Sequence, residues 1–174
     1  MSARVTPLGV LLVVAFVTAA CNDPVRNTEV SELGAEARGV PAGPLHRPGQ
    51  PCLACHGGDG PADTEFALAG TVYQRIDGKV PLHDATMRFI DSAGAEYGVV
   101  SNCVGNFWAS ADNFRPVWPV WTKLEYEGNS VEMTSAMFRE GSCGECHADP
   151  ASPSRVGHLY FADENGSLSQ ERCR

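Results

Sequence analysis

The stretch 85-ATMRFID-91 decides the fold of this chain. Its apolar residues Ala85, Met87 and Phe89 alternate with polar residues. Because successive side chains of a β-strand point to opposite faces, this alternation predicts a strand with one face in a hydrophobic core. Turn residues bound the stretch on both sides, with Asp77-Gly78 before it and 91-DSAGAE-96 at its end. The strand is therefore short, and the chain turns back on itself after it.

Further segments of the same kind lie on either side of this strand. They are 66-FALAGTVYQ-74, 97-YGVVSN-102, 107-FWAS-110 and 119-PVWTKLEYEGNSVEM-133, the last of which contains its own Gly128-Asn129 turn. About six or seven short strands at such spacing are typical of an antiparallel β-sandwich. The sequence therefore predicts a mainly β fold, with the sandwich spanning residues 66–137.

The middle of the chain resembles the prealbumin-like, carboxypeptidase-regulatory-type β-sandwich modules. The stretch with this resemblance is 68-LAGTVYQRIDGKVPLHDATMRFIDSAGAEYGVVSNCVGNFW-108, and its matching positions are Gly70, Val72, Pro81, Leu82, Ala85 and Gly105-Asn106-Phe107. Met87 stands where such modules more often carry a β-branched residue, and Cys103 is unusual before the Gly-Asn turn. The resemblance implies a fold and no activity, because these modules serve as structural or binding units.

Two copies of one cysteine motif flank the predicted sandwich. The first is 52-CLACH-56 and the second is 143-CGECH-147, and each places a histidine directly after a Cys-x-x-Cys pair. This pattern is the signature of c-type haem attachment. The chain is thus similar to c-type cytochromes in two segments, residues 48–65 and residues 138–174.

The resemblance to c-type cytochromes implies two covalently bound haem c groups. Cys52 and Cys55 would form thioether bonds to the first haem, and Cys143 and Cys146 would form thioether bonds to the second. The adjacent histidines, His56 and His147, would be the proximal iron ligands. Two other interpretations explain less: the pairs are much further apart than in zinc ribbons, and no βαβ pattern surrounds a thioredoxin-like dithiol.

Candidates for the distal iron ligands are less sharply defined. Methionine or histidine can complete the coordination of a low-spin haem iron. His46 precedes the first motif and His158 follows the second, so both are candidate distal ligands. His83 is expected to be a turn residue, and Met133 and Met137 are expected to pack at strand ends.

The N-terminus has the features of an export signal, assigned to residues 1–20. A basic start is followed by an apolar run at residues 8–17, which is shorter than the roughly 20 residues of a membrane-spanning helix. The sequence 18-TAAC-21 resembles the lipobox of bacterial lipoproteins, although Thr18 replaces the usual aliphatic residue. The resemblance implies lipidation of Cys21, and residues 21–47 are expected to form a flexible tether.

Composition constrains the partners of the chain. Its 174 residues carry a net charge of −8 and no cluster of Lys or Arg, which argues against nucleic-acid binding. A redox partner protein is expected to present a basic face. Outside the cytoplasm the two remaining cysteines, Cys103 and Cys173, are candidates for a disulfide.

The sequence therefore predicts an exported dihaem c-type cytochrome, periplasmic or at the cell surface, that carries single electrons beside a membrane. Two alternatives remain open at this point. One is a dihaem enzyme of the peroxidase kind, and the other is a binding module in which the haems act as redox sensors or structural staples. The three tryptophans, Trp108, Trp118 and Trp121, are expected to line a sandwich edge or to cover a haem face.

Overall fold

The computed structural model describes residues 23–36, 38–148 and 155–161, and the chain divides into two compact units after Leu33. The first unit contains helix α2 (Pro24–Glu32). The Asp23 carboxylate accepts hydrogen bonds from the backbone N–H groups of Val25 and Arg26, and proline occupies the first helical position. Both features favour the start of a helix. The segment expected to be a flexible tether therefore contains a regular helix.

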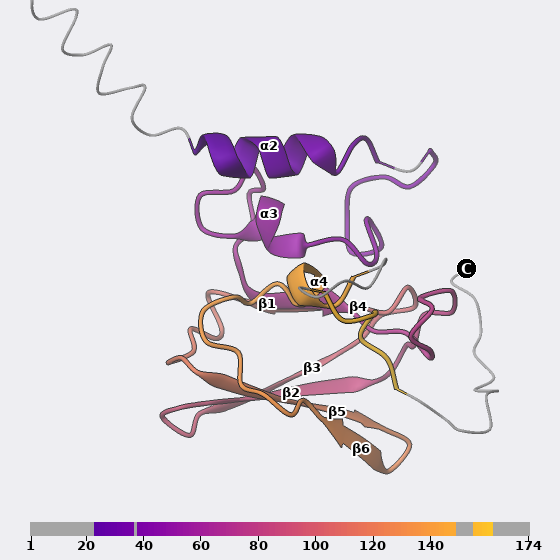
Figure 1. The fold of residues 1–174 in the computed structure, drawn as a ribbon, viewed down its shortest axis with the longest axis vertical. Helices are drawn as coiled ribbons and strands as arrows, with labels where there is room; N and C mark the ends of the chain where they lie inside the picture. Colours follow the sequence, from indigo (N-terminus) through magenta and orange to yellow (C-terminus); the bar gives the residue numbers. More distant parts are fainter. Residues whose placement is uncertain (1–22, 37, 149–154, 162–174) are drawn as a thin grey trace, which may run out of the picture. The chain divides into compact units, whose positions relative to one another are not determined.

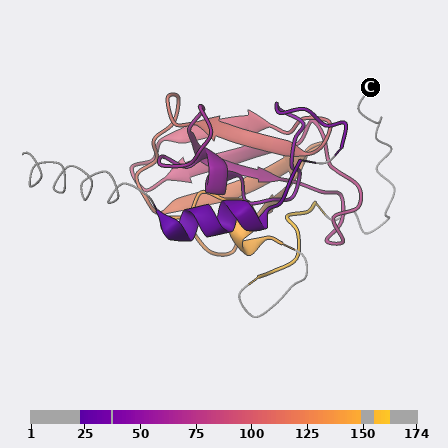
Figure 2. The same cartoon turned by 90° about the horizontal axis from the view of Figure 1, so that it is seen from above.

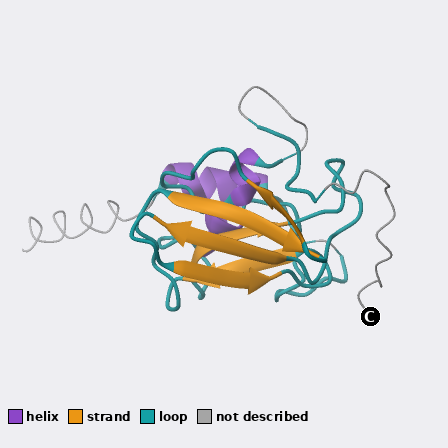
Figure 3. Ribbon diagram, turned by 90° about the horizontal axis from the view of Figure 1, so that it is seen from below, coloured by secondary structure: helices purple, strands orange, loops and turns teal. Residues whose placement is uncertain are grey.

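The second unit is an antiparallel β-sandwich, which confirms the predicted fold class (Figure 1). One sheet contains β1 (Phe66–Thr71) and β4 (Asn106–Ser110). The other has the strand order β3-β2-β5-β6, formed by β2 (Thr86–Asp91), β3 (Glu96–Val100), β5 (Val120–Tyr126) and β6 (Asn129–Glu132). Figure 3 shows the larger sheet from the side opposite to β1 and β4.

The core lies between the two sheets and follows the predicted alternation. Met87 and Phe89 of β2 are fully buried, and so is Val120 of the neighbouring strand β5. The polar residues between them face outward, where Arg88 forms an ion pair of 2.6 Å with Glu125. Other buried members of the core include Leu68, Val72, Leu82, Ala85, Phe107, Ala109, Phe114 and Leu124. Burial of this apolar surface is the main source of stability for such a fold.

Strand β1 departs from the alternation that the sequence predicts. The alternation places Phe66, Leu68, Gly70 and Val72 on one face of the strand, but every residue from Leu68 to Gln74 is buried. A bulge lies between Phe66 and Leu68. The outer face of β1 is covered because short helices and loops that precede and follow the sandwich pack against it (Figure 2).

Segments outside the sandwich are fastened to it by hydrogen bonds. Asn106 donates from its side-chain amide to the carbonyl of His46 at 2.9 Å, and Gly49 donates to the Thr71 hydroxyl at 2.7 Å. At the other end, Phe161 enters the core and its N–H donates to the Tyr73 carbonyl at 3.0 Å. The segment before the first motif is thus held on the sheet, although the tether was expected to reach residue 47.

Among the residues that the structure describes, no helix has the length and apolar character needed to cross a membrane. The predicted signal peptide and Cys21 lie outside these residues.

Candidate functional site

Both cysteine motifs form short helices next to β1. Helix α3 (Cys52–His56) contains the whole first motif, and helix α4 (Cys143–Cys146) contains the second up to its histidine. Both helices lie over the smaller sheet, on the side away from the larger one (Figures 1 and 2). A helical turn brings residues three or four apart to the same side, so the two thiols and the histidine of each motif can face one ligand.

Helix α4 begins where the sequence suggests, but for a different reason. The Ser-x-x-Glu pattern of Ser142 and Glu145 predicts a capping box. In the structure the Ser142 side chain makes no capping hydrogen bond, and its hydroxyl is buried without a hydrogen-bond partner among the described residues. The backbone of Ser142 is extended and forms a parallel bridge with Ala69 of β1.

The second motif is built into the edge of the smaller sheet. The Ala69 N–H donates to the Gly141 carbonyl at 2.9 Å, and Ser142 continues this pairing as a parallel bridge. This geometry turns Cys143 toward the core, where it is 8% exposed. A Cβ atom at Gly70 would lie only 2.7 Å from the Cβ of Cys143. Glycine at position 70 is therefore what lets the motif pack this closely.

The two motifs are in direct contact despite their separation in sequence. A Cβ atom at Gly144 of α4 would lie 2.9 Å from the Gln50 carbonyl oxygen and 3.1 Å from the Pro51 nitrogen, which directly precede α3. The charge of a Cys52 thiolate also acts on the Cys143 thiol. The sandwich therefore brings the motifs side by side instead of holding them at opposite ends.

The motif thiols are free; Cys143 is buried and Cys52 is partly buried. Burial raises the pKa of Cys52 to about 11, with a smaller contribution from the charge of Cys55. Burial likewise raises the pKa of Cys143 to about 12. Both groups are therefore protonated at neutral pH, unlike the thiolate of a reactive dithiol, whose pKa is lowered.

The four motif thiols are not gathered around one point in the described part of the chain. All four motif cysteines are outside disulfides. Within residues 23–36, 38–148 and 155–161, no three side chains of His, Cys, Asp or Glu are grouped to hold a metal ion. A four-thiolate site needs its sulfurs close together around one centre.

The two motif histidines share one hydrogen-bonding pattern. His56 Nδ1 lies 2.9 Å from the Thr64 carbonyl oxygen, and His147 Nδ1 lies 3.2 Å from the Gly157 carbonyl oxygen. Because a carbonyl can only accept, each neutral imidazole carries its proton on Nδ1 and leaves the lone pair on Nε2. A ring nitrogen held in this way is suited to ligate a metal, and its partner fixes the tautomer.

Aromatic rings surround the first motif histidine. The His56 ring stacks on Phe66 with a centroid distance of 4.2 Å and an interplanar angle of 11°. Phe66 in turn lies 5.8 Å from the ring of Trp108, which is 37% exposed. On its other side, His56 has the ring of His46 at 5.8 Å. A row of four rings therefore leads from His46 through the first motif to the surface of β4.

The candidate distal ligand His46 lies close to the first motif. Its Nδ1 accepts a hydrogen bond from the Gly43 N–H at 3.0 Å, so the neutral ring carries its proton on Nε2. In this state neither nitrogen of His46 offers a free lone pair. Coordination through Nε2 would require loss of that proton, and coordination through Nδ1 would require release of the Gly43 hydrogen bond.

The other candidate, His158, packs on Tyr73 with a centroid distance of 4.8 Å. Its Nδ1 is buried and has no hydrogen-bond partner among the described residues. Gly49, just before the first motif, also approaches this pair, since a Cβ there would lie 2.6 Å from the Tyr73 hydroxyl oxygen. The structure thus places His158 beside the segment leading into the first motif, although it follows the second in sequence.

The remaining candidates lie apart from the motif histidines. His83 contacts the Asp84 carboxylate at 2.7 Å in a turn, and Met137 packs against the core, where its backbone pairs with Val120. Cys103 is disulfide-bonded, while its expected partner Cys173 lies outside the described residues. Trp118 packs against the core, and Trp108 and Trp121 are partly exposed on strands of the two sheets.

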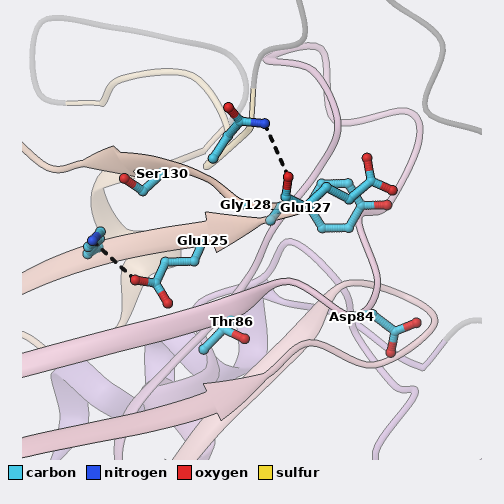
Figure 4. A pocket seen from close by; sticks show the side chains of 9 residues that line it. Asp84, Thr86, Glu125, Glu127, Gly128 and Ser130 are labelled. Atoms are coloured by element: carbon cyan, nitrogen blue, oxygen red, sulfur yellow. Dashed lines mark hydrogen bonds and ion pairs between the residues drawn. The ribbon is translucent and has the colours of Figure 1, made fainter.

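A separate pocket of about 430 Å³ opens at the end of the larger sheet (Figure 4). No residue of either motif lines it. Its central carboxylate, Glu125, is neutralised by Arg88 and by Lys123 at 3.1 Å, and these partners lower the pKa of Glu125. The pocket therefore has the character of a solvated ion-pair network.

Sequence reasoning did not identify three residues that shape the site. Thr64 and Gly157 provide the histidine acceptors through backbone carbonyls, which carry no side-chain signal. Phe66 was expected to be a core residue of β1, but the bulge after it directs its ring toward His56. The sequence around Phe66 does not mark this role, because the bulge arises from the pairing of β1 with β4.

Comparison of the chain with protein-family models, with curated proteins and with solved structures found no match.

Proposed function

We propose that this protein is an exported dihaem c-type cytochrome that carries single electrons at a membrane surface. One observation carries the proposal: in both Cys-x-x-Cys-His motifs the histidine Nδ1 binds a backbone carbonyl, which leaves Nε2 as a free ligand atom. A chance arrangement would not be expected to repeat this feature beside two pairs of free cysteines. The two motifs therefore fit the group that their sequence implies.

Each haem would be held by one motif. Cys52 and Cys55 would provide thioether bonds to the first haem and Cys143 and Cys146 to the second, while His56 and His147 would bind the irons through Nε2. When bound, haem iron supplies a centre that gains and loses one electron. The hydrogen bonds on Nδ1 keep each imidazole in the required tautomer.

The burial of Cys143 and the partial burial of Cys52 imply an order of events. Both thiols are protonated at neutral pH in the folded chain, because burial raises the pKa of Cys52 to about 11 and that of Cys143 to about 12. Addition to a haem vinyl group needs an accessible sulfur atom, and a thiolate is the stronger nucleophile. Haem attachment is therefore expected before the motifs pack against β1, during export and not after folding.

The contact between the motifs supports electron transfer between the two haems. Gly144 of the second motif packs against the backbone that precedes the first. Two haems attached at adjacent helices would lie near one another, which shortens the path between their irons. This arrangement supports a carrier that accepts an electron at one haem and releases it from the other.

The decisive experiment is a pyridine haemochrome assay with intact mass on protein produced with haem-maturation machinery. The expected result is a mass increase equal to two haem groups. A variant with both cysteines of one motif replaced by alanine should carry one haem. The variant of the other motif is the control, since it should also carry one haem. A chain whose mass equals that of the polypeptide and any lipid, without a Soret band, would end the proposal.

The same sample separates the carrier from an enzyme of the peroxidase kind. Two low-spin haems that react slowly with peroxide are expected of a carrier. High-spin absorption and rapid peroxide reactivity would instead indicate an open coordination position at one iron. In a redox sensor, the affinity for a partner would differ between the reduced and the oxidised protein. Substitutions on the sandwich surface that abolish this difference in affinity would indicate a sensor.

Export and lipidation of Cys21 are part of the proposal and rest on the N-terminal sequence alone. The expected partner is a redox protein with a basic docking face, because the chain has a net charge of −8. Incorporation of labelled fatty acid should depend on Cys21, and a Cys21→Ser variant should be released in soluble form. Fatty-acid incorporation that is unchanged in this variant would contradict the assignment.

A further inference from the structure

The two motif histidines differ in how strongly their Nδ1 protons are bound. Around His56 there are two oxygen acceptors, the Thr64 carbonyl at 2.9 Å and the Thr64 hydroxyl at 3.1 Å. His147 has one acceptor, the Gly157 carbonyl at 3.2 Å. Hydrogen bonds of this kind weaken as the distance grows beyond about 3.0 Å. The His56 proton is therefore drawn more strongly toward its acceptors than the His147 proton.

A stronger hydrogen bond at Nδ1 makes an imidazole a more basic ligand at Nε2. A more basic ligand stabilises the ferric state over the ferrous state, so it lowers the reduction potential of the iron it binds. Both histidine side chains are partly buried, although the His56 hydrogen bond lies at an exposed position and the His147 hydrogen bond is partly buried. The two sites also differ in their acceptors, and Thr64 is the residue that provides both acceptors of the first.

On these grounds we propose that Thr64 is a positioning residue that gives the first haem the lower of two reduction potentials. The inference rests on the proposed dihaem function and adds a direction to it. Electrons would pass from the haem of His56 to the haem of His147, because transfer toward the higher potential is favourable. The Thr64 hydroxyl acts through His56 and does not itself contact the iron.

The loop that carries Thr64 suits this role. Thr64 lies eight residues after His56, just before β1, and both its carbonyl and its hydroxyl turn back to the same ring nitrogen. Phe66, two residues further on, stacks on the His56 ring and holds it in line with these acceptors. The loop end and the start of the strand therefore act together on one imidazole.

The test is a spectroelectrochemical titration of the haem-loaded protein and three variants. Thr64→Val removes the hydroxyl and keeps the shape of the side chain, while Thr64→Ser keeps the hydroxyl. Thr86→Val, in β2 of the other sheet, is the matched control. We expect Thr64→Val to raise the lower potential and leave the higher one in place, and the other two variants to leave both unchanged.

Electron paramagnetic resonance of the oxidised protein provides a second readout. The g-values of one haem should change in Thr64→Val and return to their original values in Thr64→Ser. Three results in Thr64→Val would overturn the inference: no change in either potential, a shift of the higher potential alone, or an equal shift of both. Each of these results would leave the dihaem assignment intact. A chain without haem by mass would overturn the proposed function and this inference with it.

Discussion

Replacement of Gly70 by alanine tests the position of the second motif in the fold. A Cβ atom at this position would lie 2.7 Å from Cys143 Cβ, 2.9 Å from Phe107 Cζ and 3.2 Å from Cys143 Sγ. Carbon atoms in contact are ordinarily about 3.5–4.0 Å apart, so the new methyl group would require shifts of about 1 Å. Rotation of the cysteine side chain cannot provide them, because its Cβ moves only with the backbone.

The magnitude follows by comparison with a second glycine. A methyl group added at Gly98 of β3 would have its nearest neighbouring atom at 3.9 Å, so Gly98→Ala is the control. Both substitutions reduce the conformational freedom of the unfolded chain by the same amount, and that contribution cancels in the comparison. What remains is the cost of overpacking a well-packed core, about 1–3 kcal/mol. Gly70→Ala should be the less stable variant by that amount.

Urea unfolding of the full chain, followed by circular dichroism, measures this difference. The midpoint should fall in Gly70→Ala with an unchanged slope, because a change in midpoint alone reports stability. Equal midpoints for the two variants would show that Cys143 does not pack against β1, and the account of the site would then be wrong.

Three further predictions concern the contact between the motifs, the buried thiols and the aromatic row. Gly144→Ala should push the motifs apart and weaken the influence of one haem on the potential of the other in a redox titration, whereas Gly58→Ala, with its nearest atom at 3.7 Å, should not. In the haem-free chain, the raised pKa values of Cys52 and Cys143 stabilise the fold fully below the unfolded value of 9.0, and this stability should be lost as the pH rises through about 11 to about 12. Urea unfolding on both sides of pH 9 should show a loss of up to a few kcal/mol. A haem-loaded chain should lose less, because its thioethers do not titrate, whereas Tyr73, whose pKa is also raised by burial, still does. Phe66→Leu should change the g-values of only the haem bound by His56, because it removes the stacked ring, and unchanged spectra would contradict the stack.

Local sequence determined the larger sheet and the two motif helices. The alternation in 85-ATMRFID-91 places Met87 and Phe89 in the core, because side-chain direction in a strand repeats every two residues whatever the rest of the chain does. The spacing of each Cys-x-x-Cys-His motif likewise fits a single helical turn. These features depend on neighbours along the chain, so they could be predicted from the sequence.

Tertiary structure alone decided how the site is assembled. The alternation in β1 was a poor guide, because the smaller sheet is covered on its outer face by segments that are distant in sequence. Ser142 matches a capping pattern, but its side chain makes no capping hydrogen bond and its backbone forms a bridge to Ala69 of β1. The contact between the motifs and the carbonyl acceptors of His56 and His147 also depend on loops folding back over the sandwich. Backbone carbonyls are the same in every residue, so only the path of the chain selects which of them a histidine meets.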